Sequence, residues 1–185
     1  MFENKSNLAL IMDLQDRLLA NIVNKDSLLS SNELWIKACK LLQLDTILTE
    51  QVPDKLGPTH PALLKVAKDL PVLAKNSFSA FGNEEFLERI ERCKPSRLIL
   101  SGVETSICIY LTAIDAIEHK LQVTVLSDGV AGRRPEDSNT ALRELANRGA
   151  SVIPIETVIY SFLKDASHDQ FKPLSALIRE RPYSR

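Results

Sequence analysis

The strongest constraint on the fold is an alternation, along the whole chain, of short aliphatic runs with longer amphipathic segments. The aliphatic runs carry little polar alternation and lie at residues 8–12, 46–49, 71–75, 97–101, 122–127 and 151–155. Strands covered on both faces have this pattern, whereas strands with one wet face alternate apolar and polar residues. The runs therefore predict six strands of a parallel sheet.

Helical spacing follows most of these runs. The clearest helix comes after the fourth run, where apolar residues recur every three or four positions at Ile107, Leu111, Ile114, Ile117 and Leu121. Further helices are predicted at residues 26–44, 83–93, 135–148 and 167–181. Strands that alternate with helices form right-handed βαβ units. We therefore expect an α/β protein, a three-layer α/β/α sandwich with a six-stranded parallel, Rossmann-like sheet, as one domain over residues 1–185.

Composition narrows the class of partner. Lys and Arg total 23 against 24 Asp and Glu, so the net charge of −1 offers no basic footprint for nucleic acid or an anionic membrane. No run approaches the roughly 18 apolar residues of a membrane helix, and Asp13 interrupts the first run before a signal-peptide core forms. Three widely spaced cysteines, at positions 39, 93 and 108, are typical of free thiols in a reducing compartment. We expect a cytoplasmic protein, with a mitochondrial location left open for a eukaryotic source.

Three reactive side chains follow strand ends, which is where open α/β sheets bind ligands. Asp13 either caps a helix or has an ionisation state set by buried neighbours. Lys75 either extends to solvent or pairs with an anion. Cys108, behind a tight turn that begins at Gly102, is either a small buried apolar residue or a thiol whose thiolate is stabilised by helix N–H groups. Those N–H groups also suit an oxyanion, and the three side chains are expected to converge on one cleft.

Six blocks of the sequence carry a further signal, namely ALIMDLQ, TEQVPDKLGPT, LAKNSFSAF, SGVETSICIYLTAIDA, VTVLSDGVAGRRPED and DASHDQFKPLSALI. Their order and spacing resemble the isochorismatase-like (cysteine hydrolase) family, and especially its branch of isochorismatase domain-containing proteins. The resemblance covers nearly the whole chain. It implies a catalytic triad of Asp13, Lys75 and Cys108, a cis peptide between Val103 and Glu104, and a homo-oligomer. It also implies that the backbone N–H groups of Glu104 and Cys108 face the developing oxyanion.

The segment after the second run departs from the metal-dependent nicotinamidases of this family, which carry an Asp and paired histidines there. This chain has TEQVPDKLGPTH, with Asp54 and a solitary His60, whereas zinc needs three or four well-placed ligands. We therefore predict no metal and no cofactor. His119 and His168 lie on helical patterns and are expected to be solvated or structural. Trp35, on another predicted helix, lies either at an oligomer contact or in the core.

The presence of Cys108 favours a cysteine-dependent hydrolase that acts on a small amide or a related C–N or acyl substrate. In this hypothesis Cys108 forms a thioester, Asp13 is the base and Lys75 is the electrostatic partner. Isochorismatases proper, which hydrolyse a vinyl ether, do not rely on the cysteine, and a reaction of that type is one alternative. A catalytically lapsed oligomeric binding or scaffold protein of the same fold is the other. A nucleotide-binding Rossmann domain is disfavoured, because DLQDRLL after the first run lacks a glycine-rich phosphate loop.

Four loop residues on the predicted active face are candidates for contact with the small-molecule substrate. Gln15 and Gln51 would bind a small polar substrate through their amides. Phe78 and Phe81 would exclude water from it, although both aromatic side chains fit the core equally well.

Overall fold

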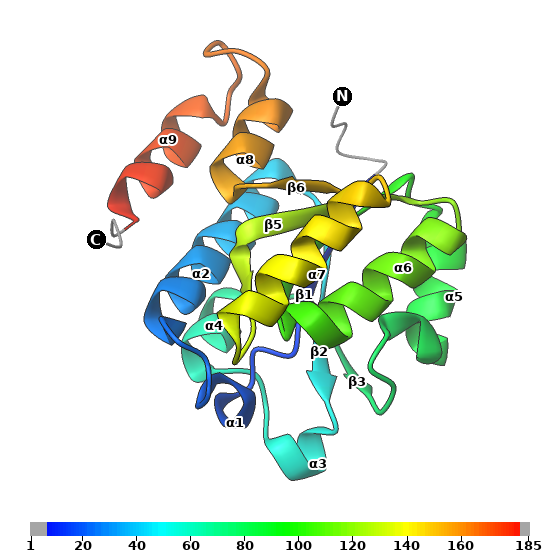
Figure 1. The fold of residues 1–185 in the computed structure, drawn as a ribbon. Coiled ribbons are helices and arrows are strands. Elements are labelled where there is room, and N and C mark those ends of the chain that lie inside the picture. Colours follow the sequence, from blue (N-terminus) through cyan, green and yellow to red (C-terminus); the bar gives the residue numbers. More distant parts are fainter. Residues whose placement is uncertain (1–6, 182–185) are drawn as a thin grey trace.

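Six parallel strands form the centre of the molecule (Figure 1), in a computed structural model that describes residues 7–181. The strands are β1 (Asn7–Met12), β2 (Asp45–Gln51), β3 (Val72–Lys75), β4 (Arg97–Val103), β5 (Gln122–Ala131) and β6 (Ser151–Ile153). They lie in the order β3-β2-β1-β4-β5-β6, and every neighbouring pair is parallel. The predicted six-stranded parallel sheet and the α/β class are confirmed.

Helices cover both faces of this sheet (Figure 1). On one face lie α2 (Lys25–Leu42), α4 (Pro61–Val66), α8 (Ile155–Leu163) and α9 (Phe171–Glu180). On the other lie α5 (Glu84–Cys93), α6 (Tyr110–Glu118) and α7 (Pro135–Asn147). Shorter turns join them, namely α1 (Asp16–Leu19), α3 (Pro53–Leu56), the 3-10 turn η2 (Ala80–Gly82) and the π-helical turn η3 (Thr105–Ile109). The predicted three-layer sandwich is therefore confirmed.

Strand β1 shows why its sequence lacks polar alternation. Ala9 and Ile11 pack in the hydrophobic cluster beneath α2 and α8. Leu8, Leu10 and Met12 pack in the cluster on the opposite face, beneath α6. Because successive side chains of a strand point to opposite faces, a strand covered by helices on both sides must be apolar throughout.

The last predicted strand is too long, and the helix that follows it was not predicted. Residues 151–155 were interpreted as strand, but β6 ends at Ile153, and Pro154 is the N-cap of α8. The buried positions of α8 include Ile155, Val158 and Ile159, a helical spacing. The continuous apolar run favours strand locally, whereas proline before the first turn starts a helix that buries its apolar face against α2 and β5.

Two further expectations bear on the surface. Trp35, on α2, is fully buried in the core. Of the two positions considered for it, the core is therefore the one that the structure shows. Within residues 7–181, no helix combines the length and apolar character needed to cross a membrane. Residues 1–6, which carry part of the expectation about secretion, lie outside the described residues.

Candidate active site

Asp13, Lys75 and Cys108 meet at the carboxyl edge of the sheet. Asp13 directly follows β1, Lys75 is the last residue of β3, and Cys108 lies in η3 after β4. Strands β1 and β4 are neighbours at the point where the strand order reverses direction, the usual ligand position in open α/β sheets. The topology thus brings together residues up to 95 positions apart, the difference between 108 and 13.

Asp13 and Lys75 form a buried ion pair. Lys75 Nζ lies 2.7 Å from Asp13 Oδ2, and both side chains are 0% exposed. The Thr49 hydroxyl donates to Asp13 Oδ1 at 2.7 Å, and the Asp13 N–H donates to the Thr49 carbonyl at 3.0 Å. Asp13 has a positive φ of 57° and caps no helix, since α1 begins at Asp16 with Gln15 as its N-cap. The local sequence and β2 therefore fix the carboxylate toward Lys75.

Lys75 is surrounded by acceptors. Its ammonium donates to Gln51 Oε1 at 2.5 Å and lies 3.3 Å from the carbonyls of both Ser77 and Phe78. The Cys108 sulfur lies 3.8 Å from the same nitrogen. A lysine that extended to solvent would form none of these contacts. Lys75 is instead the buried cation that lies between Asp13, Gln51 and Cys108.

Gln15 and Gln51 support this lysine through a chain of hydrogen bonds. Gln15 Nε2 donates to the carbonyls of Gln51 and Gly57, at 3.0 and 2.6 Å, and its Oε1 accepts the Gln51 N–H at 2.8 Å. Gln51 Nε2 donates to the Asn76 carbonyl at 2.8 Å, which turns its Oε1 toward Lys75. Every polar atom of the two amides is engaged within the protein. Their sequence positions predicted a place on the active face but not these partners.

Cys108 is a thiol at rest in this site. The side chain is 6% exposed, and burial raises its pKa to about 12, with the Asp13 charge and its hydrogen bond adding to the rise. Lys75 and a backbone hydrogen bond at Glu104 lower the pKa but do not offset burial. The sequence left Cys108 either as a small buried apolar residue or as a thiolate stabilised by helix N–H groups. In the structure, burial and the neighbouring carboxylate outweigh any stabilisation of the thiolate.

The turn that carries Cys108 depends on a glycine. Gly102 pairs with Met12 of β1 and has a φ of +114°, and a Cβ at this position would lie 2.0 Å from the Met12 carbonyl oxygen. Only glycine allows β4 to approach β1 this closely. The Val103–Glu104 peptide bond, just after this glycine, is cis. The π-helical turn η3 begins at the next residue, and in it the Ile109 N–H donates to the Glu104 carbonyl at 3.2 Å.

The two phenylalanines differ in their surroundings. Phe81 is buried, with its ring 5.2 Å from Phe86 in an edge-on arrangement and 4.6 Å from the His119 ring. Phe78 is 57% exposed and belongs to the loop whose carbonyls lie near Lys75. Phe81 therefore belongs to the core cluster, and Phe78 is the aromatic side chain available at the surface near the site.

The histidines serve as local hydrogen-bond partners. His60 Nδ1 accepts the Ala62 N–H at the start of α4, and His168 Nδ1 accepts the Gln170 N–H. His119 Nδ1 lies 2.8 Å from the Asp115 carbonyl. Within the part of the chain that the structure describes, no three His, Cys, Asp or Glu side chains are grouped so as to hold a metal ion.

The fold and this edge of the sheet define an isochorismatase-type α/β protein, and comparison with known proteins agrees. The isochorismatase domain model matches residues 7–157, so the chain belongs to this family. Among its relatives is isochorismatase domain-containing protein 2 of Danio rerio, which is 32% identical over 174 residues, or 94% of this chain and 87% of the relative.

Solved structures show the same fold. MAR1 ribonuclease from Caenorhabditis elegans superposes with a TM-score of 0.91 at 27% identity, covering 100% of this chain and 98% of that one. The YcaC gene product of Escherichia coli, described as an octameric hydrolase of unknown specificity, has a TM-score of 0.89 at 24% identity, covering 96% of this chain and 88% of that one. At this identity, the likeness to the YcaC gene product shows a shared fold and nothing about activity.

Proposed function

We propose that the protein is a cysteine-dependent hydrolase of a small amide or a related C–N or acyl substrate. The observation that carries the proposal is the convergence of a thiol, a carboxylate and an ammonium in one buried site, with Lys75 Nζ 2.7 Å from Asp13 and 3.8 Å from Cys108. A nucleophile, a base and a group that orients them are the elements of covalent catalysis.

The reaction has two halves. Asp13 takes the proton of the Cys108 thiol, and the sulfur attacks the substrate carbonyl, forming a C–S bond and an oxyanion. The backbone N–H groups of Glu104 and Cys108 bind that oxyanion. Its collapse breaks the C–N bond, and the amine leaves with the proton from Asp13. Water then gives a proton to Asp13 and attacks the thioester, and the carboxylic product leaves as the thiol recovers the proton.

The raised pKa of Cys108 means that the thiol keeps its proton until Asp13 removes it during the reaction. A resting thiol is protected from adventitious chemistry, and proton transfer to Asp13 is coupled to attack on a bound carbonyl. A positioned proton transfer contributes about 10² to 10⁴ in rate. Lys75 lowers the pKa of the thiol and holds the carboxylate, so it stabilises both anionic partners in turn. Gln15 and Gln51 act by positioning Lys75 rather than by contacting the substrate, and Phe78 is the candidate wall of the pocket.

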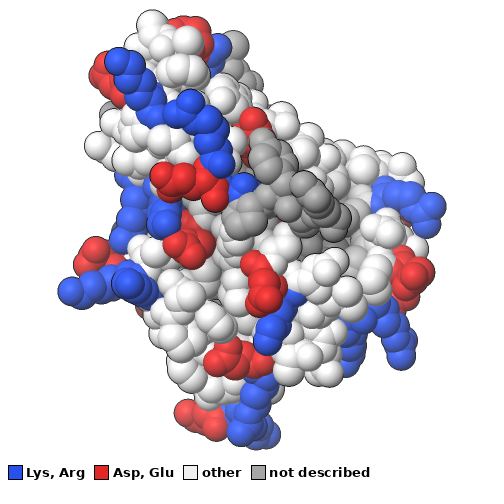
Figure 2. All heavy atoms as spheres, turned by 90° about the vertical axis from the view of Figure 1, so that its left-hand side faces the viewer, with Lys and Arg blue, Asp and Glu red and all other residues white. Residues whose placement is uncertain are grey.

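A small neutral or weakly charged substrate suits the surface better than a polyanion. On the face shown in Figure 2, Lys and Arg side chains are interspersed with Asp and Glu and form no continuous basic area. The net charge of −1 agrees. Nucleic acid and membrane partners are therefore not proposed. Homo-oligomerisation and a cytoplasmic location stay predictions, the first supported by the octameric state described for YcaC.

Iodoacetamide labelling tests this site without a known substrate. Iodoacetamide reacts with the thiolate, so a pKa of about 12 predicts slow labelling of Cys108 at neutral pH and a rate that rises about tenfold per pH unit toward 12. Asp13→Asn removes a charge that raises the pKa, so labelling at pH 8–9 becomes faster. Lys75→Met removes a charge that lowers the pKa, so labelling becomes slower. Peptide mass spectrometry at several pH values gives each rate.

Two controls accompany this measurement. Asp16→Asn changes an exposed carboxylate three residues from Asp13 and should leave the rate unchanged. Cys39 is fully buried with a raised pKa, so it stays unlabelled in any variant that remains folded. Equal Cys108 rates in wild type, Asp13→Asn and Lys75→Met, with Cys39 protected, would mean that the three groups do not act together.

A further inference from the structure

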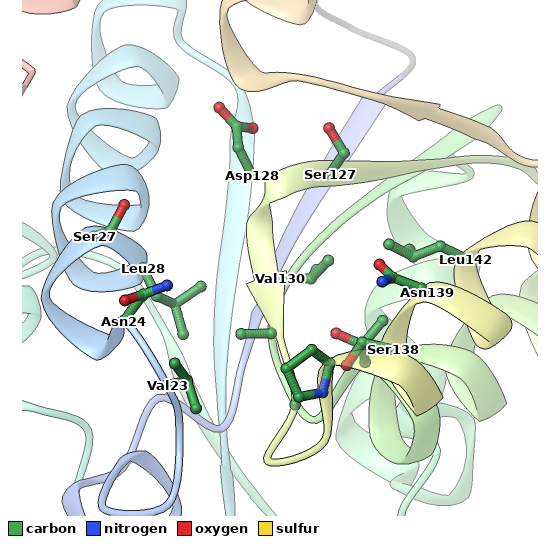
Figure 3. Close-up of a pocket in the computed structure, with 14 residues that line it drawn as sticks. Val23, Asn24, Ser27, Leu28, Ser127, Asp128, Val130, Ser138, Asn139 and Leu142 are labelled. Atoms are coloured by element: carbon green, nitrogen blue, oxygen red, sulfur yellow. The ribbon is translucent and has the colours of Figure 1, made fainter. Parts of the chain in front are cut away.

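A hollow lies at the carboxyl edge of the sheet, above the end of β5 and between the first turns of α2 and α7 (Figure 3). Its volume is about 270 Å³, enough for a small organic molecule. None of the three residues of the candidate active site lines it. Thr105 does line it, three residues before Cys108, so the hollow lies behind the turn that carries the thiol.

Within residues 7–181, several polar side chains that line this hollow have no hydrogen-bond partner, although Ser138 and Asp128 do have one. Thr105 is fully buried, and its hydroxyl oxygen forms no hydrogen bond among the described residues. Within the same part of the chain, the side chains of four further lining residues form no hydrogen bond. Figure 3 shows Asn24 and Ser27 on one wall of the hollow and Ser127 and Asn139 on the other. A buried hydroxyl without a partner is unfavourable, and a ligand in the hollow could supply the missing hydrogen bond.

The formal charges around the hollow are already compensated. Asp128 is the sole charged residue among those that line it, and its carboxylate accepts from Arg181 at 2.5 Å and from the Ile155 N–H at 2.8 Å. The remaining polar groups are amides and hydroxyls, joined by apolar contacts from Leu28, Val130 and Leu142. The chemistry of the lining therefore matches a neutral molecule with hydrogen-bonding groups and an apolar edge.

The N-terminus of α7 adds donors at one wall. Pro135 occupies its first turn, and the N-cap residue, Arg134, forms no side-chain cap. The first N–H groups of a helix have no partner within the helix. Glu136 and Asp137 in the same turn offset the positive end of the helix for an anion, so a neutral acceptor such as a hydroxyl or carbonyl oxygen fits better.

We propose that this hollow is a second ligand site, separate from the Cys108 centre, that binds a small neutral molecule carrying hydroxyl or amide groups beside an apolar edge. A molecule bound there contacts Thr105 and thus the turn that presents Cys108. The Glu104 carboxylate in that turn also accepts the Arg133 N–H at 3.4 Å, which ties the turn to the loop that leads into α7. The site does not depend on the proposed hydrolase activity.

The test is an NMR titration of backbone amides with four probes of similar size. Erythritol and malonamide are neutral, and malonate and 1,3-diaminopropane are charged. We expect the neutral probes alone to shift the amides of Thr105, Ser127 and Asn139, equally in wild type and in Cys108→Ala. Asn139→Leu should weaken that binding at least tenfold. Asn147→Leu, an exposed position at the far end of the same helix, should leave it unchanged.

Four results would overturn the proposal. Preferential binding of a charged probe would contradict the neutral chemistry. Shifts that disappear in Cys108→Ala would assign the probes to the active site. Binding that survives Asn139→Leu would place them elsewhere. No shift with any probe would mean that the hollow holds no ligand of this class, as when a second copy of the chain covers it.

Discussion

Cys108→Ala is expected to lower kcat/KM by at least about 10³-fold while the protein remains folded, because alanine can form no thioester and leaves Asp13 without a proton to transfer. The side chain is small and 6% exposed, so its loss removes little apolar packing. The measurement is a screen of small amides and esters with purified wild type, followed by kcat/KM for the variant on any compound that is hydrolysed. Circular dichroism and urea unfolding check the fold.

Cys93→Ala is the matched control for this comparison. Cys93 is a partly exposed cysteine on α5 that lies near Asp45 and away from the site, so its removal should leave kcat/KM unchanged. Retained turnover in Cys108→Ala would contradict the thioester and favour the vinyl ether type of hydrolysis, which does not need the thiol. Absence of turnover in wild type across the screen would favour the lapsed scaffold.

Lys75→Met is expected to lower the free energy of unfolding by about 3–5 kcal/mol and to abolish turnover. The substitution leaves the Asp13 carboxylate without its cation in a position that is 0% exposed, and burial of an uncompensated charge is strongly unfavourable. The Thr49 hydroxyl and the Cys108 thiol remain as donors to that side chain, and neither carries a compensating charge. Urea unfolding of the variant and wild type, with m-values compared, measures the change.

Two further variants test whether the loss of stability in Lys75→Met comes from the burial of the unpaired Asp13 charge. Lys37→Met breaks an ion pair with Glu33 of the same 2.7 Å length, but its side chains are 40% and 38% exposed, so the loss should stay within about 1 kcal/mol. The double variant Asp13→Asn, Lys75→Met removes both charges and should be more stable than Lys75→Met alone. Similar losses for Lys75→Met and Lys37→Met would show that the buried pair is not the stabilising element we describe.

The fold could be predicted from the sequence because burial on both faces leaves a local signature. Six aliphatic runs indicated six strands, and β1 to β5 fall on them within a few residues. The boundary at Pro154 was wrong because the residues Val-Ile-Pro-Ile are apolar whether they form strand or helix. The helix that begins after Pro154 is stabilised by packing against α2 and β5.

The candidate site was predictable in part for the same reason. Asp13, Lys75 and Cys108 stand at strand ends, and parallel strands end at one edge, so their convergence follows from topology. The roles of Gln15 and Gln51 do not follow, because their partners are backbone and side-chain groups more than 20 residues away in sequence. The pKa of Cys108 also depends on burial and on Asp13, which a sequence position near a helix terminus does not reveal.

The central claim is that Cys108 becomes covalently acylated, and p-nitrophenyl acetate tests it most directly. The account predicts a burst of p-nitrophenolate approaching one per chain, followed by slower turnover, with the acetyl group on the Cys108 peptide after acid quench. Asp13→Asn should slow the burst and lose the slower phase, since the same carboxylate takes the thiol proton and activates water. A burst of equal size in Cys108→Ala, or acetylation spread over other residues with none on Cys108, would contradict the account.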